Sequence, residues 1–210
     1  MPNFEQLIAS PTAAFEEGLA FFRGRGMLNN TLLRIVSDLE QNGIDYALID
    51  AVALSQHGYR RFTEDIDLLM TKDGLREFQE RLVGKGYVPA FTGATKAFKT
   101  SPENVRVEVV TAGEYPGDGE PKSVVFPDPR ENSETIDGVK TILLEKLLEL
   151  KLASGMTAPD RLRDLADVQE VIKIKGLTEE FGNRLNESVR EKFGELHRGV
   201  VLARDRGMQT

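Results

Sequence analysis

The sequence predicts an α/β fold, in which a small mixed β-sheet with flanking helices is followed by a helical C-terminal domain. Three observations predict it. Apolar residues recur at helical spacing before residue 43, short β-branched runs alternate with turns and helices up to residue 110, and the chain reads as helical beyond about residue 135. We therefore expect an α/β domain with N-terminal helices over residues 1–135 and a helical domain over 136–210.

The first elements follow from apolar spacing and helix breakers. Residues 3–23 predict one or two amphipathic helices, broken at Ser10-Pro11. Residues 31–42 predict a helix that stops at Gly43. A short strand is expected over residues 46–49, and a helix over 52–57 that ends at Gly58.

The middle of the chain alternates between strands and turns. We expect a strand over residues 66–70, a helix over 74–84, a hairpin over 87–98 and a strand over 105–110. Residues 113–129 are rich in glycine and proline and predict a loop, with one short strand at 124–126. Three helices are then expected, over residues 139–153, 159–174 and 181–200.

Composition excludes several classes of protein. The 210 residues carry a net charge of −7, which argues against a broad nucleic-acid-binding surface, and there are no cysteines for disulfides, zinc–thiolate sites or a thiol nucleophile. The N-terminus lacks a basic region followed by an apolar core, so we expect no signal peptide. No window approaches the roughly eighteen apolar residues of a membrane span. A cytoplasmic location is the default expectation.

The residues that point most directly to chemistry are Asp65 and Asp67. In a strand, side chains two residues apart project from the same face, about 6–7 Å apart, while Ile66 and Leu68 point into a core. Two adjacent carboxylates cost free energy unless a cation lies between them. Magnesium prefers oxygen ligands, so this pair predicts a metal site for phosphate chemistry.

Glu108 offers a third carboxylate on a later strand. If that strand lies beside the one that carries Asp65 and Asp67, three acids converge on one sheet face. Three such acids can hold two metal ions about 3.5–4 Å apart for in-line phosphoryl displacement. The alternative is a solvated glutamate on the polar side of a half-buried strand.

Residues 48–54, His57-Gly58, Arg61, Thr63 and Asp65-Ile66-Asp67 together resemble the nucleotidyltransferase superfamily, whose core is DNA polymerase beta-like. The resemblance is strongest to its minimal prokaryotic branch, which includes abortive-infection and toxin–antitoxin nucleotidyltransferases. Lys151-Leu152-Ala153 and residues 161–167 resemble the lysine and Arg-Asp-x-x-Asp helices of that branch. The match spans residues 44–175 with gaps.

The resemblance implies transfer of a nucleoside monophosphate from a nucleoside triphosphate (NTP) to a hydroxyl acceptor, with release of pyrophosphate. The acceptor stays open among an RNA end such as that of tRNA, a protein side chain and a small molecule. Two Mg²⁺ ions would be held by Asp65, Asp67 and Glu108, and Glu108 would help to deprotonate the acceptor. The nucleotide-binding positions implied are Asp50, Ala51, Arg61 and Lys151.

One departure from the family pattern bears on function, because Asp50-Ala51 stands where the family has a glycine pair. The Asp50 carboxylate would lie where polyphosphate is expected, or would cap the helix that phosphate otherwise uses. An alternative function is therefore a catalytically degenerate protein that binds a partner protein in a toxin–antitoxin type system. A metal-dependent hydrolase is disfavoured, since His57 and His197 are the only histidines.

The remaining polar residues are open to plainer interpretations. Arg61 positions phosphate or pairs with Glu64, and Lys151 faces the cleft or extends its ammonium group to water. His57 is expected to pack or cap a helix end rather than act as a base. We expect Asp164 and Asp167 to bond to Arg161, Arg163 or a neighbouring helix end. The loop over residues 113–119 is expected to border the active cleft.

Overall fold

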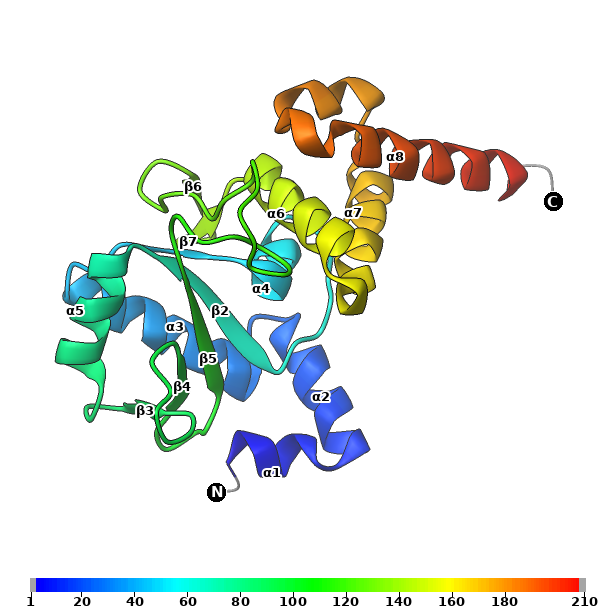
Figure 1. Ribbon diagram of the computed structural model, residues 1–210. Coiled ribbons are helices and arrows are strands. Elements are labelled where there is room, and N and C mark those ends of the chain that lie inside the picture. The colour runs from blue at the N-terminus through cyan, green and yellow to red at the C-terminus, as the bar shows by residue number, and fades with distance from the viewer. Residues whose placement is uncertain (1–2, 208–210) are drawn as a thin grey trace.

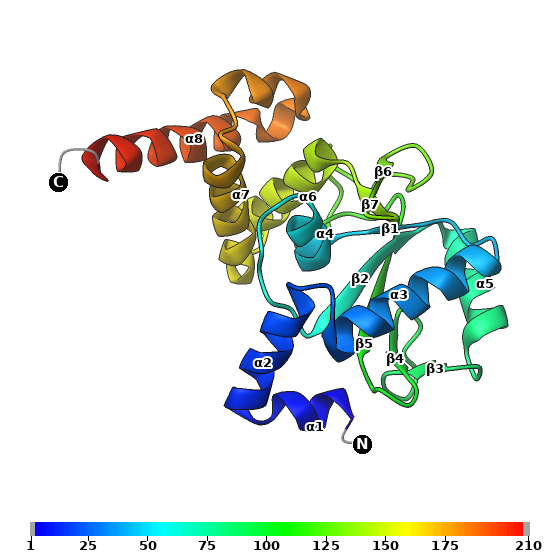
Figure 2. The same ribbon diagram turned by 180° about the vertical axis from the view of Figure 1, so that it is seen from behind.

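The computed structural model describes residues 3–207. Three N-terminal helices, α1 (Phe4–Ile8), α2 (Pro11–Phe21) and α3 (Gly26–Gln41), precede the sheet. The expected break between the first two is confirmed, because the Ser10 hydroxyl caps α2 and Pro11 occupies its first turn. Helix α3 runs along the back of the sheet in Figure 1 and along its front in Figure 2.

A seven-stranded mixed sheet forms the centre of the described chain, in the order β3-β4-β5-β2-β1-β7-β6. Strand β2 pairs antiparallel with β1 and parallel with β5, while β7 pairs parallel with β1. The other pairs are antiparallel hairpin neighbours. The bounds are β1 (Tyr46–Leu48), β2 (Asp65–Met70), β3 (Tyr87–Pro89), β4 (Ala97–Thr100), β5 (Arg106–Thr111), β6 (Ser133–Ile136) and β7 (Val139–Ile142).

Alternation along β2 and β5 separates the core from the polar face of the sheet. Ile66, Leu68 and Val107 are fully buried in the core, whereas Asp65, Asp67 and Glu108 point the other way and are half-buried. Helices α4 (Asp50–Gln56) and α5 (Lys72–Leu82) each follow a strand and pack against the sheet. The α/β fold class expected from the sequence is confirmed.

The chain after the sheet is helical. Helix α6 (Leu144–Thr157) packs against α7 (Leu162–Lys175), and α7 packs against α8 (Glu187–Gly207). Short 3₁₀ turns at Pro159–Arg161 and Glu179–Arg184 separate these helices. The far end of α8 projects away from the rest of the molecule (Figures 1 and 2). None of the helices in the described part of the chain is long and apolar enough to cross a membrane.

Three sequence-based expectations need correction. Residues 139–142 are strand β7 rather than the start of a helix, because Asp137 and Gly138 both adopt positive φ and turn the chain into a β6–β7 hairpin. Residues 124–126 form no strand, although Phe126 exchanges backbone hydrogen bonds with Gly113 and Glu114. The helix expected over 181–200 is instead a 3₁₀ turn followed by α8.

The expected domain boundary at residues 135 and 136 falls within strand β6. Strand β7, on the far side of that boundary, pairs with β1 and so belongs to the sheet. The change to purely helical structure comes at Leu144, where α6 begins. The division into two domains stays a prediction.

Candidate active site

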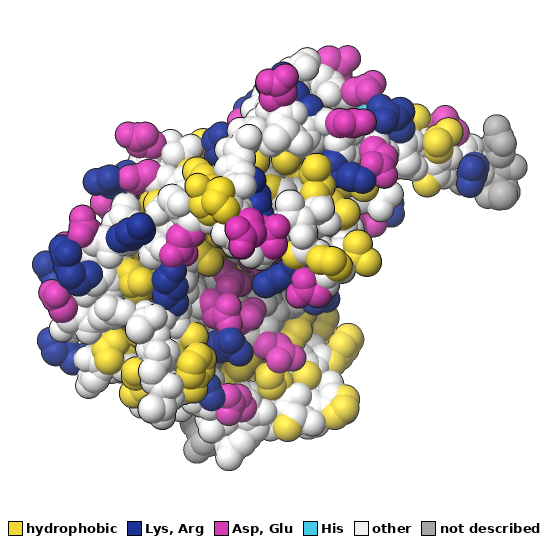
Figure 3. Space-filling model, viewed as in Figure 1, with side chains coloured by type: hydrophobic (Ala, Val, Ile, Leu, Met, Phe, Trp, Pro, Cys, Tyr) yellow, Lys and Arg dark blue, Asp and Glu magenta, His cyan; other side chains and the backbone are white. Residues whose placement is uncertain are grey.

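Strands β2 and β5 bring three of the predicted carboxylates to one face of the sheet. The parallel register places Asp67 directly opposite Glu108, and Asp65 lies two residues earlier on the same face of β2. The Thr63 hydroxyl donates a hydrogen bond to the Asp65 carboxylate at 2.5 Å, which fixes that side chain at the first position of the strand. Figure 3 shows acidic side chains gathered in a hollow of this face of the molecule.

The electrostatics of this group are unbalanced. Burial raises the pKa of Asp67 well above its usual value, and the neighbouring charges of Asp65, Asp50 and Glu108 raise it further. Lys151 acts in the opposite direction without compensating for them. Asp67 is therefore surrounded by other carboxylates, with too little positive charge beside them. This is the environment expected around a ligand for a divalent cation.

Glu108 is oriented toward a different partner. Its carboxylate forms an ion pair with Arg106 on the same strand, and both side chains are partly exposed. Exposed pairs of this kind contribute little to stability, so the Glu108 side chain can rotate toward Asp67 at small cost. The roles of Asp65, Asp67 and Glu108 as metal ligands stay predictions.

Asp50 does not cap helix α4. It is the first residue of α4, with a φ of +50° that favours glycine, and no side-chain cap is formed at this helix end. Its carboxylate instead accepts hydrogen bonds from Lys151 at 2.5 Å and from Arg61 at 3.2 Å. The following residue, Ala51, is buried in the first turn of the helix.

Lys151 lies at the centre of a second carboxylate group, which we call the Lys151 cluster and which consists of Asp50, Asp164, Asp167 and Lys151. The Lys151 ammonium is 2.8 Å from Asp164 and 2.9 Å from Asp167. The Ser154 hydroxyl also donates to Asp164, at 2.6 Å. The Lys151 side chain is only 5% exposed, so this ammonium does not extend to water.

The pKa values of Asp50 and Lys151 are both shifted toward the charged forms. Burial opposes ionisation of Asp50, but Lys151 and Arg61 outweigh it and hold the Asp50 pKa below its usual value. Burial likewise opposes protonation of Lys151, and the three aspartates outweigh it and raise the Lys151 pKa. Opposite charges in contact therefore compensate one another here.

The three aspartates of the Lys151 cluster are the one set of three acidic or histidine side chains, among residues 3–207, whose ligand atoms all lie within 4.8 Å. Proximity alone would suggest a metal site. However, the ammonium group already occupies the centre of the set at hydrogen-bonding distance from each aspartate. A metal ion would have to displace a buried lysine, so we interpret this cluster as an internal ion-pair network.

These contacts identify the partners of Arg61 and His57, whose roles the sequence left open. Arg61 pairs with Asp50 and Asp167, the latter at 3.4 Å, rather than with Glu64. His57 is the residue that ends α4, and its Nε2 lies 2.8 Å from the Ile142 carbonyl oxygen of strand β7, which agrees with the expected packing role at a helix end.

Asp164 and Asp167 were expected to bond to nearby arginines or a helix end, yet their main partner is Lys151. The spacing of Asp164 and Asp167, three residues apart on one helix face, was the available sequence signal for a shared partner.

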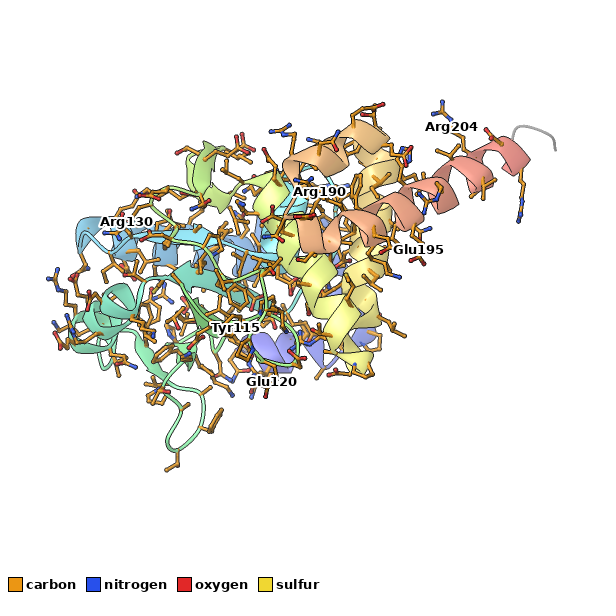
Figure 4. All side chains as sticks on the ribbon, turned by 45° about the horizontal axis from the view of Figure 1, so that its top comes forward. Tyr115, Glu120, Arg130, Arg190, Glu195 and Arg204 are labelled. Carbon is orange, nitrogen blue, oxygen red and sulfur yellow. The ribbon has the colours of Figure 1, made fainter. Side chains whose placement is uncertain are left out.

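Two hollows flank Asp50. One has a volume of about 300 Å³ and lies on the Glu108 side, where Asp67 and Glu108 meet the apolar side chains of Val110, Phe126 and Leu147. The loop after β5, which bears Tyr115 (Figure 4), also lines it, as expected for a loop bordering the cleft. The other has a volume of about 620 Å³ and lies between residues 61–65 and the start of α7.

Comparisons with known proteins identify the fold. No family model and no curated protein matches the chain. Among solved structures, the antibiotic-resistance protein ANT(2'')-Ia in complex with adenylyl-2''-tobramycin is similar at 12% identity and a TM-score of 0.50, over 82% of this chain and 98% of that chain. A Thermotoga maritima protein assigned as a nucleotidyltransferase is similar at 16% identity and a TM-score of 0.49, over 65% and 89% of the two chains. The chain has the nucleotidyltransferase fold.

Proposed function

We propose that this protein transfers a nucleoside monophosphate from an NTP to a hydroxyl acceptor and releases pyrophosphate. The single observation that supports it most is the β2–β5 register, which sets Asp67 opposite Glu108 with Asp65 on the same face. The similarity to ANT(2'')-Ia, whose complex contains an adenylylated antibiotic, supports the same general reaction.

The donor set fits magnesium. Asp65, Asp67 and Glu108 supply only carboxylate oxygens, and the raised pKa of Asp67, caused by burial and neighbouring carboxylates, reflects negative charge without enough positive charge beside it. Asp65 and Asp67 would hold both ions and Glu108 would hold one. Bound Mg²⁺ would acidify the attacking hydroxyl and neutralise the departing pyrophosphate.

The protein's own groups would then orient and deprotonate the acceptor. The Thr63 hydroxyl keeps the Asp65 carboxylate in one orientation through its 2.5 Å hydrogen bond. Glu108, once released from Arg106, accepts the proton of the acceptor hydroxyl as the new phosphate ester bond forms. The hydroxyl oxygen attacks the α-phosphorus of the NTP, and the bond to the pyrophosphate oxygen breaks.

The acceptor would bind in the hollow of about 300 Å³ beside Glu108. Its mixed lining, with Val110, Tyr115 and Phe126 beside acidic residues, favours a small molecule or a short protruding group over an extended nucleic acid. An RNA end and a protein side chain remain within the proposal, because both can present one hydroxyl to such a hollow.

A second candidate function is supported by Asp50. The carboxylate holds Lys151 and Arg61, two of the positions expected to bind nucleotide. A protein in which these cations are permanently occupied would act as a catalytically degenerate binding partner, of the toxin–antitoxin type implied by the sequence resemblance. This candidate predicts no magnesium-dependent NTP binding.

The test is label transfer. The purified protein is incubated with Mg²⁺, a cell extract and each α-³²P-labelled NTP in turn, and the labelled molecule is identified. We expect Asp67→Ala to lower transfer by at least about a thousandfold, because the metal contributes several kcal/mol to the transition state. The matched control is Asp73→Ala on the exposed surface of α5. Wild-type transfer rates in Asp67→Ala would exclude this site assignment.

A further inference from the structure

The larger hollow, of about 620 Å³, has no role in the reaction as described so far. It lies between the segment that leads into β2 and the start of α7, and it shares Asp50, Arg161 and Asp164 with the acceptor hollow. Its volume lies within the range of about 300–1,000 Å³ that is usual for ligand sites. It is lined by Asp50, Arg61, Phe62, Thr63, Glu64, Asp65, Asp160, Arg161, Arg163 and Asp164.

The cations expected to bind nucleotide are already engaged. Lys151 is held by all three aspartates of the Lys151 cluster at 2.5–2.9 Å. Arg61 pairs with Asp50 at 3.2 Å and with Asp167 at 3.4 Å. Helix α4, at whose first position Asp50 stands, has only seven residues. Neither these cations nor this helix end offers uncompensated positive charge to a polyphosphate.

Arg161 and Arg163 differ from these residues in that no carboxylate in the described part of the chain holds them in an ion pair, although the charge of Arg161 contributes to the lowered pKa of Asp50. Both are exposed, both line the larger hollow, and neither guanidinium has an ion pair or side-chain hydrogen bond with any residue between 3 and 207. Asp65, which is expected to hold metal, lines the same hollow. A guanidinium group binds phosphate oxygens through paired N–H donors and stays charged at all ordinary pH values.

We propose that the hollow between residues 61–65 and α7 is the triphosphate site of this protein, and that Arg161 and Arg163 bind the β- and γ-phosphates in place of the family's glycine pair. The inference rests on the proposed function. It assigns to Asp50 the role of keeping Lys151 and Arg61 inside the protein, so that phosphate is bound by α7 instead of by α4.

The charge balance of the hollow agrees with an anionic ligand that arrives with its metal. Asp50 and Asp164 are both paired with Lys151, and Asp50 is also paired with Arg61. Glu64 and Asp160 are the other acids of the lining, besides Asp65. The positive charge of a metal ion bound at Asp65 would offset the negative charge of these side chains. We therefore expect polyphosphate binding to depend on magnesium and to weaken as salt is added.

The test measures binding alone, so that it does not depend on an acceptor. Inorganic tripolyphosphate with Mg²⁺ is titrated by calorimetry into the wild type, into the double variant Arg161→Gln/Arg163→Gln, and into the control Arg204→Gln/Arg206→Gln. The control makes the same charge change at two exposed positions on α8. Arg204 lies on the part of α8 that projects from the molecule (Figure 4).

We expect the α7 double variant to raise the Kd for tripolyphosphate by at least about tenfold, since it loses the hydrogen bonds between charged groups that hold the phosphate oxygens. The control should leave the Kd unchanged. Equal binding by the wild type and the α7 double variant, equal weakening in both double variants, or no binding by the wild type would each overturn the inference. Binding as expected without any label transfer would overturn the proposed function and leave this site intact.

Discussion

The protein holds two groups of three carboxylates, and the groups differ in the positive charge that balances them. Asp65, Asp67 and Glu108 project from adjacent strands with no cation at their centre, and burial and mutual repulsion raise the pKa of Asp67. The other group surrounds the ammonium of Lys151. Carboxylates that a protein leaves uncompensated are available to an external cation, whereas compensated ones form part of the fold.

The largest expected effect on stability comes from removing the positive charge of Lys151, which lies at the centre of the second group. Lys151→Met should lower the free energy of unfolding by about 3–5 kcal/mol, because it leaves buried carboxylates without their partner. Urea denaturation measures this change. Lys173→Met, at an exposed position of α7, is the matched control and should have little effect. A loss below about 1 kcal/mol in Lys151→Met would show that the cluster is not an internal network.

The same chemical change should have opposite signs in the two groups. Asp167→Asn should destabilise the protein by about 1–3 kcal/mol, because Asp167 is buried and contacts both Lys151 and Arg61. Asp67→Asn, measured without metal, should stabilise it by about 1 kcal/mol, because the substitution removes repulsion. Chemical denaturation in the presence of a chelator compares them. If both variants were less stable than the wild type, the two groups of carboxylates would not differ in their counter-charge as described.

A smaller effect is expected in the pH dependence of stability. The pKa of Asp67 is raised in the folded state above the unfolded value of about 3.9, so the folded state binds more protons and stability falls as pH rises above that value. The pKa of Asp50 is lowered, so its stabilising contribution is full above pH of about 4 and is lost as pH falls through the folded pKa.

Urea unfolding of the wild type, Asp67→Asn and Asp50→Asn, measured from about pH 4 to pH 7, tests the predicted pH dependence of both contributions. The gain in stability from Asp67→Asn should grow as pH rises, because the wild-type carboxylate becomes charged at increasing cost. The loss from Asp50→Asn should be constant over the same range. A gain from Asp67→Asn that shrinks with rising pH would contradict the assigned repulsion.

The group formed by Asp65, Asp67 and Glu108 could be predicted from the sequence, whereas the Lys151 cluster could not. Alternation along a strand places Asp65 and Asp67 on one face. Glu108 was expected beside them only if its strand lay next to theirs, and the β2–β5 pairing supplies that condition. The members of the Lys151 cluster come from three helices, α4, α6 and α7, and Asp50 is 101 residues away from Lys151 along the chain. No periodicity connects such positions, so the cluster depends on how the tertiary fold brings Asp50 of α4 to the packed pair of α6 and α7.

The errors in the predicted elements have a local cause. Val139 and Ile142 fit a helical pattern with the leucines that follow, and that pattern hid strand β7. The Asp137-Gly138 pair was the missed signal, since Asp-Gly with positive φ at both residues is a preferred two-residue hairpin turn. The glycine-type φ of Asp50 was likewise predictable only from the resemblance, which has glycine there.

Metal binding tests the contrast between the two groups most directly. Mn²⁺ is titrated into the wild type, Asp67→Asn and Asp164→Asn and followed by electron paramagnetic resonance, at a temperature where circular dichroism shows all three to be folded. We predict that Asp67→Asn weakens Mn²⁺ binding by at least about tenfold, while Asp164→Asn binds as the wild type does. Loss of binding in Asp164→Asn with full binding in Asp67→Asn would place the metal in the Lys151 cluster and contradict the account.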